Sequence, residues 1–590
     1  MDQGPQAGAP IGDMKGFRQS SGSVQAERDF ERALELHTSG RTEEADRVLT
    51  GILKRSPWHF GSLHTLGVIR LQQSRLEEAL TLFRKTITGN PGSAGAHISL
   101  GNTLQALGRH EEAVERYQRA LALRPHDAHG QNNLGNSYLA LRRLEEAAEC
   151  FRQAVARQPG LDAAHGNLGN ALLELDRPEE ALRAYEAAIA LNPRVAGTHS
   201  NLGRSLAALD RHEEAIAAYE AALALDPGLA GVHSNLGRTL VALNRHEEGL
   251  LRFSRASELD PEDAQYPLNL GLTRLALGEY AAGLPDYEAR WRSPRYPKPR
   301  TYSQPRWDGS ADVAGKTIFL YFEQGLGDTI QFVRYAPLLA ERGARVVLEV
   351  PQGLLRLFRS LEGVAELLGP GDTPPDFDFH APLLSLPLAF QTRIENIPNR
   401  VPYLGANAVR TRASVGLCWA GNPGNSNDRN RSISLRELIP VLEVPGVQFL
   451  SLQKVLRQGD EAILRKYPNV DVEADRKGAD FADTAALIAG LDLVITVDTA
   501  IAHLAGALGK PVWVLLPFST HWVWLRTRED SPWYPTATLL RQPCHGDWRP
   551  AVERAAQVLS SLPWQGPPAT VSASGISSPN GRDHLSGCSL

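Results

Sequence analysis

A Leu-Gly pair returns at a fixed interval through the first half of the chain, and this period limits the possible folds more than any other feature. The interval is 34 residues at every step, from Leu66-Gly67 to Leu270-Gly271. A fixed period of this length indicates a repeat architecture, in which each unit buries its apolar face against its neighbours. The first half of the 590-residue chain is therefore predicted to fold as one solenoid.

Each of the first six clear units also carries a small residue, an aromatic residue and a proline at fixed distances after the glycine, and the seventh keeps the aromatic residue as Tyr287. In the unit of Gly101 these are Ala113, Tyr117 and Pro125. Small residues let two antiparallel helices approach, the ring fills the gap between them, and the proline ends the second helix. The pattern resembles the tetratricopeptide repeat (TPR). The resemblance implies an α-helical TPR superhelix over residues 24–292, with seven clear repeats after a weak first one.

Asparagine stands two positions before the glycine in five successive units. Because an amide both donates and accepts hydrogen bonds, such a ladder could hold the backbone of an extended peptide without reading its sequence. It could equally be solvated or serve hydrogen bonding between repeats. The superhelix of the nucleocytoplasmic O-GlcNAc transferases has such a ladder, and this resemblance implies a polypeptide partner or acceptor on the concave face. The five residues are Asn133, Asn167, Asn201, Asn235 and Asn269.

Histidine recurs four positions before the glycine in four of the units, at His97, His165, His199 and His233. Recurrence with the repeat is a property of a scaffold, whereas a metal site gathers its ligands in one place. We therefore interpret these histidines as packing residues.

The repeat pattern stops at a proline-rich stretch, residues 293–313, which is predicted to be an extended linker. Beyond it, short β-branched segments alternate with helical ones, as in a parallel α/β sheet. A break at residues 405–412 divides this half into an N-lobe at 314–404 and a C-lobe at 413–562. The expected fold is thus an α-helical solenoid followed by a two-lobed, Rossmann-type α/β domain. The two ends, 1–23 and 563–590, are predicted to be disordered.

In the N-lobe, the predicted strand Thr317–Phe322 runs into Gly325-Leu326-Gly327-Asp328 and then into a helix. Glycines at such a turn let a ligand approach the backbone, and the start of a helix favours anions. The stretch lacks the third glycine and the downstream acidic residue of a dinucleotide fingerprint, so NAD binding is not expected.

In the C-lobe, two polar segments follow predicted strands, where open α/β sheets bind ligands. The first is the loop Asn422–Ser432, in which Arg429 and Arg431 could neutralise a diphosphate. The second is Asp498-Thr499-Ala500, followed by His503, at the start of a helix whose open N–H groups suit a phosphate. A plain helix N-cap would also explain the aspartate.

The order of strand, basic loop and Asp-Thr-Ala-x-x-His motif resembles the donor-binding lobe of GT-B glycosyltransferases of the lipopolysaccharide heptosyltransferase kind, glycosyltransferase family 9. The resemblance covers residues 315–560. It implies a nucleotide-sugar donor as substrate, no cofactor, and Asp328 as the catalytic base that deprotonates the acceptor hydroxyl. The residues it implies at the donor are Arg431, Gln453, Asp498, Thr499, Ala500 and His503. Gly327 of the glycine turn and Asn422 and Arg429 of the polar loop are further donor-binding candidates.

A metal site is not expected. The one Asp-x-Asp match, Asp376-Phe377-Asp378, places two carboxylates on one face of a strand, which is too few ligands for a divalent ion. We therefore expect a metal-independent GT-B type transferase.

Three functions remain open from the sequence. The chain is either a glycosyltransferase whose TPR array presents a protein acceptor, or the same enzyme acting on a glycan or lipid core. The third is a non-catalytic TPR scaffold for protein–protein interaction, whose transferase-like domain is degenerate.

Composition excludes some partners. A net charge of −5 gives no strong pull toward nucleic acid or an anionic membrane surface. Four scattered cysteines without a CxxC pair argue against a zinc knuckle or a disulfide scaffold. With no secretory signal pattern and no long apolar run, an integral membrane segment is not expected, and a cytoplasmic location is the simplest expectation.

Overall fold

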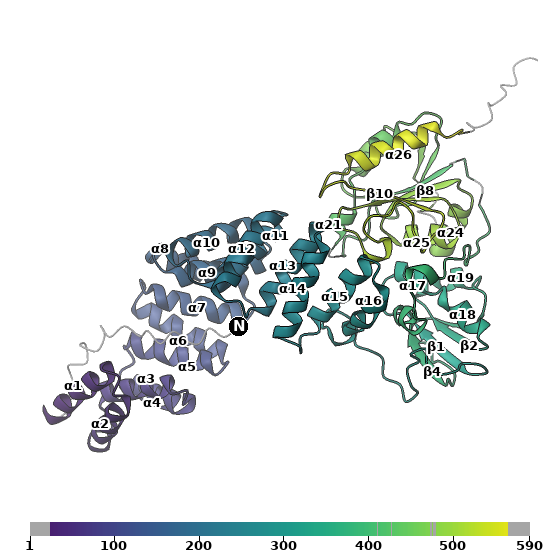
Figure 1. Ribbon diagram of the computed structural model, residues 1–590. Coiled ribbons are helices and arrows are strands. Elements are labelled where there is room, and N and C mark those ends of the chain that lie inside the picture. The colour runs from purple at the N-terminus through teal and green to yellow at the C-terminus, as the bar shows by residue number, and fades with distance from the viewer. Residues whose placement is uncertain are drawn as a thin grey trace, which may run out of the picture. The chain divides into compact units, whose positions relative to one another are not determined.

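The computed structural model describes residues 24–564 except 410, 413, 426, 473, 474 and 476–478. The predicted disordered tails therefore lie outside the described residues, apart from Pro563 and Trp564. The chain forms two compact units that divide between Thr239 and Leu240 (Figure 1). The end of the repeat array thus belongs to the same unit as the α/β domain.

The array consists of successive helix pairs, as the TPR pattern predicts. Its helices are α1 (Val24–Thr38), α2 (Thr42–Arg55), α3 (Phe60–Gln72), α4 (Leu76–Gly89), α5 (Ala94–Ala106), α6 (His110–Leu123), α7 (Ala128–Ala140), α8 (Leu144–Arg157), α9 (Asp162–Glu174), α10 (Pro178–Leu191), α11 (Ala196–Ala208), α12 (His212–Leu225), α13 (Ala230–Ala242), α14 (His246–Leu259), α15 (Gln265–Ala276) and α16 (Tyr280–Tyr287).

The 34-residue period follows from how each glycine meets an aromatic ring. A Cβ atom on Gly101 would lie 2.6 Å from the Tyr117 ring, and one on Gly169 would lie 2.6 Å from the Tyr185 ring. Both rings are fully buried. The absence of a side chain therefore lets the two helices of a pair close over the ring, and the same contact recurs at Gly67, Gly135 and Gly203.

The recurrent histidines are part of the scaffold. In each of the four, Nε2 donates a hydrogen bond of 2.9 to 3.2 Å to the carbonyl oxygen of the proline six residues earlier. The prolines are Pro91, Pro159, Pro193 and Pro227. Each histidine thus ties the start of one helix pair to the end of the preceding one.

The second unit contains two sheets whose strand pairs are all parallel. In the described residues, the N-lobe sheet has the order β3-β2-β1-β4 and the C-lobe sheet the order β10-β9-β8-β5-β6-β7. The C-lobe order is that of a Rossmann-type doubly wound sheet. The strands are β1 (Thr317–Tyr321), β2 (Arg345–Glu349), β3 (Val364–Leu368), β4 (Phe379–Pro382), β5 (Val415–Cys418), β6 (Phe449–Ser451), β7 (Val470–Asp471), β8 (Leu493–Val497), β9 (Val512–Leu516) and β10 (Ala537–Arg541).

Helices and 3₁₀ turns lie before, between and after these strands. They are α17 (Leu326–Phe332), α18 (Tyr335–Glu341), α19 (Leu355–Phe358), α20 (Leu386–Ala389), α21 (Asp428–Arg431), α22 (Ile439–Leu442), α23 (Asp460–Leu464), α24 (Phe481–Ala489), α25 (Ala500–Ala507) and α26 (Arg549–Ser561), with the 3₁₀ turns η2 (Glu288–Arg292), η3 (Gln352–Leu354), η4 (Leu383–Ser385), η5 (Ile394–Asn396) and η6 (Trp522–Trp524).

The last repeat shares a hydrophobic core with the α/β domain. Leu275, Tyr280 and Tyr287 are buried in one cluster with residues of both sheets. The Trp533 Nε1 atom donates a hydrogen bond to the Tyr280 hydroxyl at 3.1 Å, and Gln324 Nε2 donates one to the Tyr287 hydroxyl at 2.9 Å. The final helix pair is therefore an integral part of the second unit.

The proline-rich segment 293–313 lies along the N-lobe. Arg300 makes an ion pair of 2.7 Å with Glu349 on β2. Trp307 is buried, and its backbone N–H donates to the His380 carbonyl on β4 at 2.9 Å. The segment is thus fixed against the sheet by its side chains and its backbone.

The glycine-to-ring contact predicts opposite effects for two substitutions in α9. Gly169→Ala should lower the free energy of unfolding of the chain by roughly 1–3 kcal/mol, because the new methyl group overlaps the Tyr185 ring. Gly166→Ala is the matched control, since a Cβ there meets nothing within 4 Å and alanine is the better helix former. Urea unfolding followed by circular dichroism checks both, and equal stability of the two variants would contradict the packing account.

Candidate functional site

Both sheets have a switch point, where neighbouring strands lead to connections on opposite sides. These points lie between β1 and β4 in the N-lobe and between β5 and β8 in the C-lobe. Ligands of open α/β sheets bind outside the carboxyl ends of the strands at such points. The segments that follow β1 and β8 are the glycine-rich turn before α17 and the Asp498-Thr499 turn before α25.

The helices that follow these two turns pack against each other (Figure 1). A Cβ atom on Gly327 would lie 2.9 Å from Cδ2 of His503 and 3.5 Å from Cα of Ala500. The start of α17 and the start of α25 are therefore in direct contact at a position where no side chain separates them. Gly327 of the N-lobe thus meets Ala500 and His503 of the C-lobe.

Asp328 lies at this contact, in the first turn of α17. Its Oδ2 atom accepts a hydrogen bond from the backbone N–H of Gly325 at 3.2 Å. Burial raises the pKa of the Asp328 carboxyl, a neighbouring His521 opposes this rise, and Asp498 adds to it. A carboxyl group with a raised pKa is a stronger base once it is ionised, which suits proton abstraction.

His503 is buried and firmly held. Its Nδ1 atom lies 3.0 Å from the Tyr534 hydroxyl, and its ring stacks on Trp524 with 5.2 Å between the ring centroids. Burial lowers the pKa of His503 to about 4. The imidazole is therefore neutral at neutral pH and can exchange hydrogen bonds with a ligand without adding charge.

Thr499, and not Asp498, is the N-cap of α25. The Thr499 side chain accepts a hydrogen bond from the backbone N–H of Ile501 at 3.3 Å. Helix capping consequently does not explain Asp498, whose side chain is partly exposed beside Asp328. The residues that follow, Ala500 and His503, lie against Gly327.

The loop after β5 presents one arginine toward this region. Asp428 is buried, forms an ion pair with Arg457, and accepts a hydrogen bond from the Ser432 hydroxyl at 2.8 Å. The Arg431 Nε atom lies 3.9 Å from Asp428, is buried, and has no hydrogen-bond partner in the described part of the chain. The positive charge of Arg431 contributes to the lowered pKa of His503. Arg431 is thus the loop cation that an anionic ligand at the start of α25 would meet.

Three other predicted donor residues lie differently. The Gln453 amide is buried and used internally, because its Oε1 accepts from the Ala420 N–H at 3.0 Å and its Nε2 donates to the Val455 carbonyl at 3.2 Å. Asn422 is exposed and accepts from the Gly424 N–H within its own turn at 2.9 Å. Arg429 is exposed.

The Asp-x-Asp match has a structural use. Asp378 Oδ2 accepts a hydrogen bond from the Thr317 N–H at 2.8 Å, and Lys316 lies 3.3 Å from its other oxygen. Asp376 is exposed. The second aspartate thereby fixes the chain just before β4 to the start of β1.

The asparagine ladder uses its amide donors between repeats. In three members, Nδ2 donates a hydrogen bond of 2.8 to 3.0 Å to an asparagine of the preceding repeat. The pairs are Asn133 with Asn102, Asn167 with Asn132, and Asn201 with Asn170. Asn235 is half-buried, and Asn269 is buried with its Oδ1 atom accepting from Gln265 at 2.9 Å. Of the three amides that donate between repeats, Asn201 also accepts a hydrogen bond from Arg204 Nη1 at its Oδ1 atom, at 3.2 Å. The carbonyl oxygens of Asn133 and Asn167 are the acceptors that these bonds leave for a partner.

Sequence analysis missed a buried ion-pair network beside Asp328. Arg290 is 1% exposed and donates to Glu323 at 2.9 Å, to Glu288 at 2.5 Å, and to the Ser385 hydroxyl at 2.6 Å. Burial raises the pKa of Glu323 to about 7. The network joins η2, at the end of the repeat array, to the carboxyl ends of β1 and β4. The only sign of this network in the sequence was Glu323, an isolated glutamate shortly before Gly325 and Gly327.

A loop after β9 was missed as well. It carries His521, exposed and close enough to influence Asp328, and two buried tryptophans, Trp522 and Trp524. The loop directly follows a predicted C-lobe strand, and ligands of open α/β sheets bind at the carboxyl ends of the strands. This position in the sequence could have indicated that the loop lies near the site.

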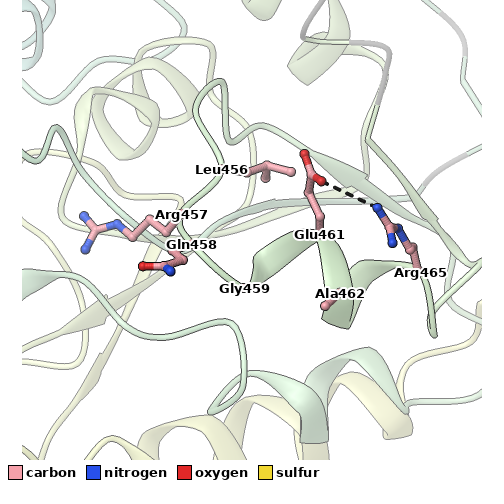
Figure 2. A pocket seen from close by; sticks show the side chains of 7 residues that line it. All are labelled: Leu456, Arg457, Gln458, Gly459, Glu461, Ala462 and Arg465. Carbon is pink, nitrogen blue, oxygen red and sulfur yellow. Dashed lines mark ion pairs between the residues drawn. The ribbon is translucent and has the colours of Figure 1, made fainter.

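Figure 2 shows a separate pocket of about 390 Å³ beside α23, lined by residues between Leu456 and Arg465. Glu461 and Arg465 form an ion pair of 3.8 Å on its wall. Its lining includes none of the residues predicted for the site.

Comparison with known families gives a match within each half of the chain. Tetratricopeptide repeat families match residues 98–162, 167–230 and 206–267. Glycosyltransferase family 9 (heptosyltransferase) matches residues 479–542, a range that contains α24, β8, α25, β9, η6 and β10. The chain is thus a TPR-repeat protein whose C-terminal domain resembles glycosyltransferase family 9, and the match supports a glycosyltransferase.

One curated relative is the protein FlbA of Caulobacter vibrioides. It is 30% identical over 316 residues, which cover 47% of this chain and 52% of FlbA. The chain therefore spans about half the length of this relative.

Solved structures match the repeat array. YrrB, a TPR protein, has 27% identity and a TM-score of 0.29, with 31% of this chain and 95% of YrrB covered. A tetratricopeptide repeat protein from Parabacteroides merdae has 18% identity and a TM-score of 0.35, with 42% and 99% covered.

None of the helices in the described part of the chain combines the length and the apolarity that a membrane crossing requires.

Proposed function

We propose that this protein is a GT-B type glycosyltransferase that moves a sugar from a nucleotide-sugar donor to an acceptor presented by its TPR array. The observation that carries the proposal is the contact of Gly327 with His503 and Ala500. This contact brings the helix start that carries Asp328 to the Asp-Thr-Ala-x-x-His motif. The motif lies inside the region that matches glycosyltransferase family 9.

The proposed reaction is a single displacement. Asp328 accepts the proton of the acceptor hydroxyl while the hydroxyl oxygen forms a bond to the anomeric carbon of the donor. The bond between that carbon and the phosphate oxygen breaks, and the nucleoside diphosphate leaves with the electron pair. Arg431 and the N–H groups at the start of α25 stabilise the charge of the leaving diphosphate.

We propose that the donor lies across the start of α25. Thr499, Ala500 and the neutral His503 ring would contact the sugar and the phosphates, and the unpaired Nε of Arg431 would reach the diphosphate. Because Arg431 supplies positive charge at the leaving group, the proposed reaction needs no divalent ion. Gln453 would act indirectly, by holding the ends of β5 and β6.

The proposed acceptor is a polypeptide held by the asparagine ladder. The carbonyl oxygens that the inter-repeat hydrogen bonds leave over could accept hydrogen bonds from the N–H groups of an extended backbone. A glycan or lipid-core acceptor, with the repeats serving assembly, is the alternative outcome of the test below.

Removal of the proposed base should abolish transfer and spare donor binding. Asp328→Asn keeps the size of the side chain but cannot take up a proton, so the rate should fall by about 10²- to 10⁴-fold. The rate is measured as nucleotide released from ADP-, GDP- and UDP-sugars with EDTA present, and donor affinity by calorimetry.

Asp376→Asn, an exposed aspartate of the same lobe, is the matched control and should keep full activity. Full activity in Asp328→Asn would overturn the assignment of the base. Neither binding nor turnover of any donor by the wild-type protein would favour a non-catalytic TPR scaffold.

Loss of the ladder should separate peptide acceptors from glycan acceptors. Alanine at Asn167, Asn201 and Asn235 together should raise KM for a peptide acceptor and leave KM for a glycan acceptor unchanged. Each lost inter-repeat hydrogen bond should also lower stability by about 1 kcal/mol, so assays are run well below the unfolding temperature.

Alanine at Glu115, Glu186 and Glu220, which are exposed on α6, α10 and α12, serves as the control triple variant. Equal KM values for the peptide in the two triple variants would exclude the ladder from acceptor binding.

A further inference from the structure

Tyr534 lies between η6 and β10 and packs against α25, the helix that carries His503. The residue is fully buried. A Cβ atom on Gly506, three residues after His503, would lie 2.3 Å from Cδ1 of the Tyr534 ring. Residues three apart share one face of a helix, so the ring lies on Gly506 while its hydroxyl reaches His503. That hydroxyl lies 3.0 Å from His503 Nδ1.

The His503 ring is held on three sides. Tyr534 contacts Nδ1, Trp524 stacks on one face with 25° between the ring planes, and the Cδ2 edge faces Gly327. The second nitrogen, Nε2, would lie 3.5 Å from a Cβ atom on Gly327, and it has no hydrogen-bond partner among the described residues. Nε2 is therefore the ring nitrogen that faces the contact between α17 and α25 and is left for a ligand.

The direction of the hydrogen bond between Tyr534 and His503 decides what Nε2 can do. Burial lowers the pKa of His503 to about 4 and raises the pKa of Tyr534 well above its usual value, so both groups are neutral at neutral pH. A neutral imidazole carries a single N–H, so one ring nitrogen donates and the other accepts. If Tyr534 donates to Nδ1, the imidazole proton is on Nε2. If Nδ1 donates to Tyr534, Nε2 is bare.

The surroundings of the Tyr534 hydroxyl favour Tyr534 as the donor. The neighbouring Tyr403 hydroxyl donates to the Ile330 carbonyl at 2.8 Å and accepts from Nη2 of Arg334 at 3.1 Å. Arg334, whose Cζ lies 4.6 Å from the centroid of the Tyr534 ring, offers only N–H donors. A buried hydroxyl proton without an acceptor costs free energy, and an oxygen that already accepts from a guanidinium is a poor one. Nδ1 of His503 is the acceptor that this proton needs.

We propose that Tyr534 is a positioning residue: its hydroxyl donates to Nδ1 of His503, keeps the imidazole proton on Nε2, and so directs an N–H group at the diphosphate of the donor. The inference rests on the proposed function, in which the donor lies across the start of α25. A fixed, neutral N–H gives a phosphate oxygen a hydrogen bond that needs no reorientation of the ring. A bare Nε2 would instead repel that oxygen, because both atoms present lone pairs.

The first test locates the proton in the ligand-free protein. The full-length chain is labelled with ¹⁵N in its histidine rings and studied by solid-state NMR, which separates protonated from bare ring nitrogens. The signals of His503 are identified by their loss in His503→Gln. The wild-type ring should carry its proton on Nε2 and have a bare, hydrogen-bonded Nδ1. A ring with its proton on Nδ1 would overturn the inference.

Tyr534→Phe removes the hydroxyl and keeps the ring that packs on Gly506. The Nδ1 signal of His503 should move in this variant, because the hydrogen bond to that atom is lost. Tyr335→Phe is the matched control, since Tyr335 is equally buried and its hydroxyl is hydrogen-bonded to Thr392 Oγ1 at 2.7 Å. The control should leave both His503 signals in place. An Nδ1 signal that stays in place in Tyr534→Phe would contradict the proposed hydrogen bond.

The second test measures, by calorimetry, the affinity for ADP, GDP and UDP and for the corresponding nucleosides. Tyr534→Phe should weaken binding of the diphosphate that the wild type binds by about 3- to 10-fold. It should leave the affinity for the nucleoside unchanged, because the Nε2–H group is proposed to contact only the phosphates. Tyr335→Phe should change neither affinity. Equal losses for diphosphate and nucleoside in Tyr534→Phe, or no loss, would leave Tyr534 a purely structural role and overturn the inference.

The inference and the proposed function fail separately. A wild-type protein that binds a diphosphate but carries the His503 proton on Nδ1 would keep the proposed function and overturn the inference. A wild-type protein that binds none of the three diphosphates would overturn the proposed function. The ring-nitrogen signals would still decide in that case whether Tyr534 holds the proton of His503 on Nε2.

Discussion

The close approach of Gly327 to His503 is the contact on which the rest of the site depends. Two parallel sheets, each with its own switch point, become one site only if the helices after β1 and β8 can touch. Glycine permits that, because any side chain at residue 327 would overlap the histidine ring. The ring itself is fixed by Tyr534 and Trp524, so it cannot move aside at little cost. The carboxyl of Asp328 then lies beside Asp498 as a consequence of backbone packing.

The boundary between scaffold and enzyme does not coincide with the end of the repeats. Tyr280 and Tyr287 are repeat residues in sequence, yet they belong to the core of the α/β unit. Arg290 adds a buried ion pair to Glu323, and the loop after β9 accepts a hydrogen bond from Asn244 at the Phe518 carbonyl. Breaking a buried pair costs several kcal/mol, whereas its net contribution when intact is small. Its effect here is to fix the end of the array against the segment between β1 and α17, the helix that carries Asp328.

Much of the fold was predictable from periodicity. The 34-residue spacing and the alternation of β-branched and helical segments predicted the solenoid and the α/β domain, because both patterns follow from burial on one face. The site residues that were predicted lie next to glycines or small residues at strand ends. The motifs there can be recognised because the backbone turn that needs them is formed by neighbouring residues in the sequence.

What could not be predicted depends on contacts between distant segments. Nothing near Gln453 in the sequence shows that its amide accepts a hydrogen bond from the backbone N–H of Ala420. The asparagine ladder left two interpretations open, and the inter-repeat hydrogen bonds of Asn133, Asn167 and Asn201 show that its donors serve the scaffold. Any role in holding a partner then falls to the remaining carbonyl oxygens.

The central claim is that the two lobes form one site at Gly327, and the rate of nucleotide release by Gly327→Ala tests it most directly. The control is Gly353→Ala in η3 of the same lobe, where a Cβ meets nothing within 4 Å. A misplacement of reacting groups by about 1 Å can cost about 10²-fold in rate, so Gly327→Ala should lose most of its turnover while Gly353→Ala keeps it. Turnover by Gly327→Ala at the rate of Gly353→Ala would contradict a site built on this contact.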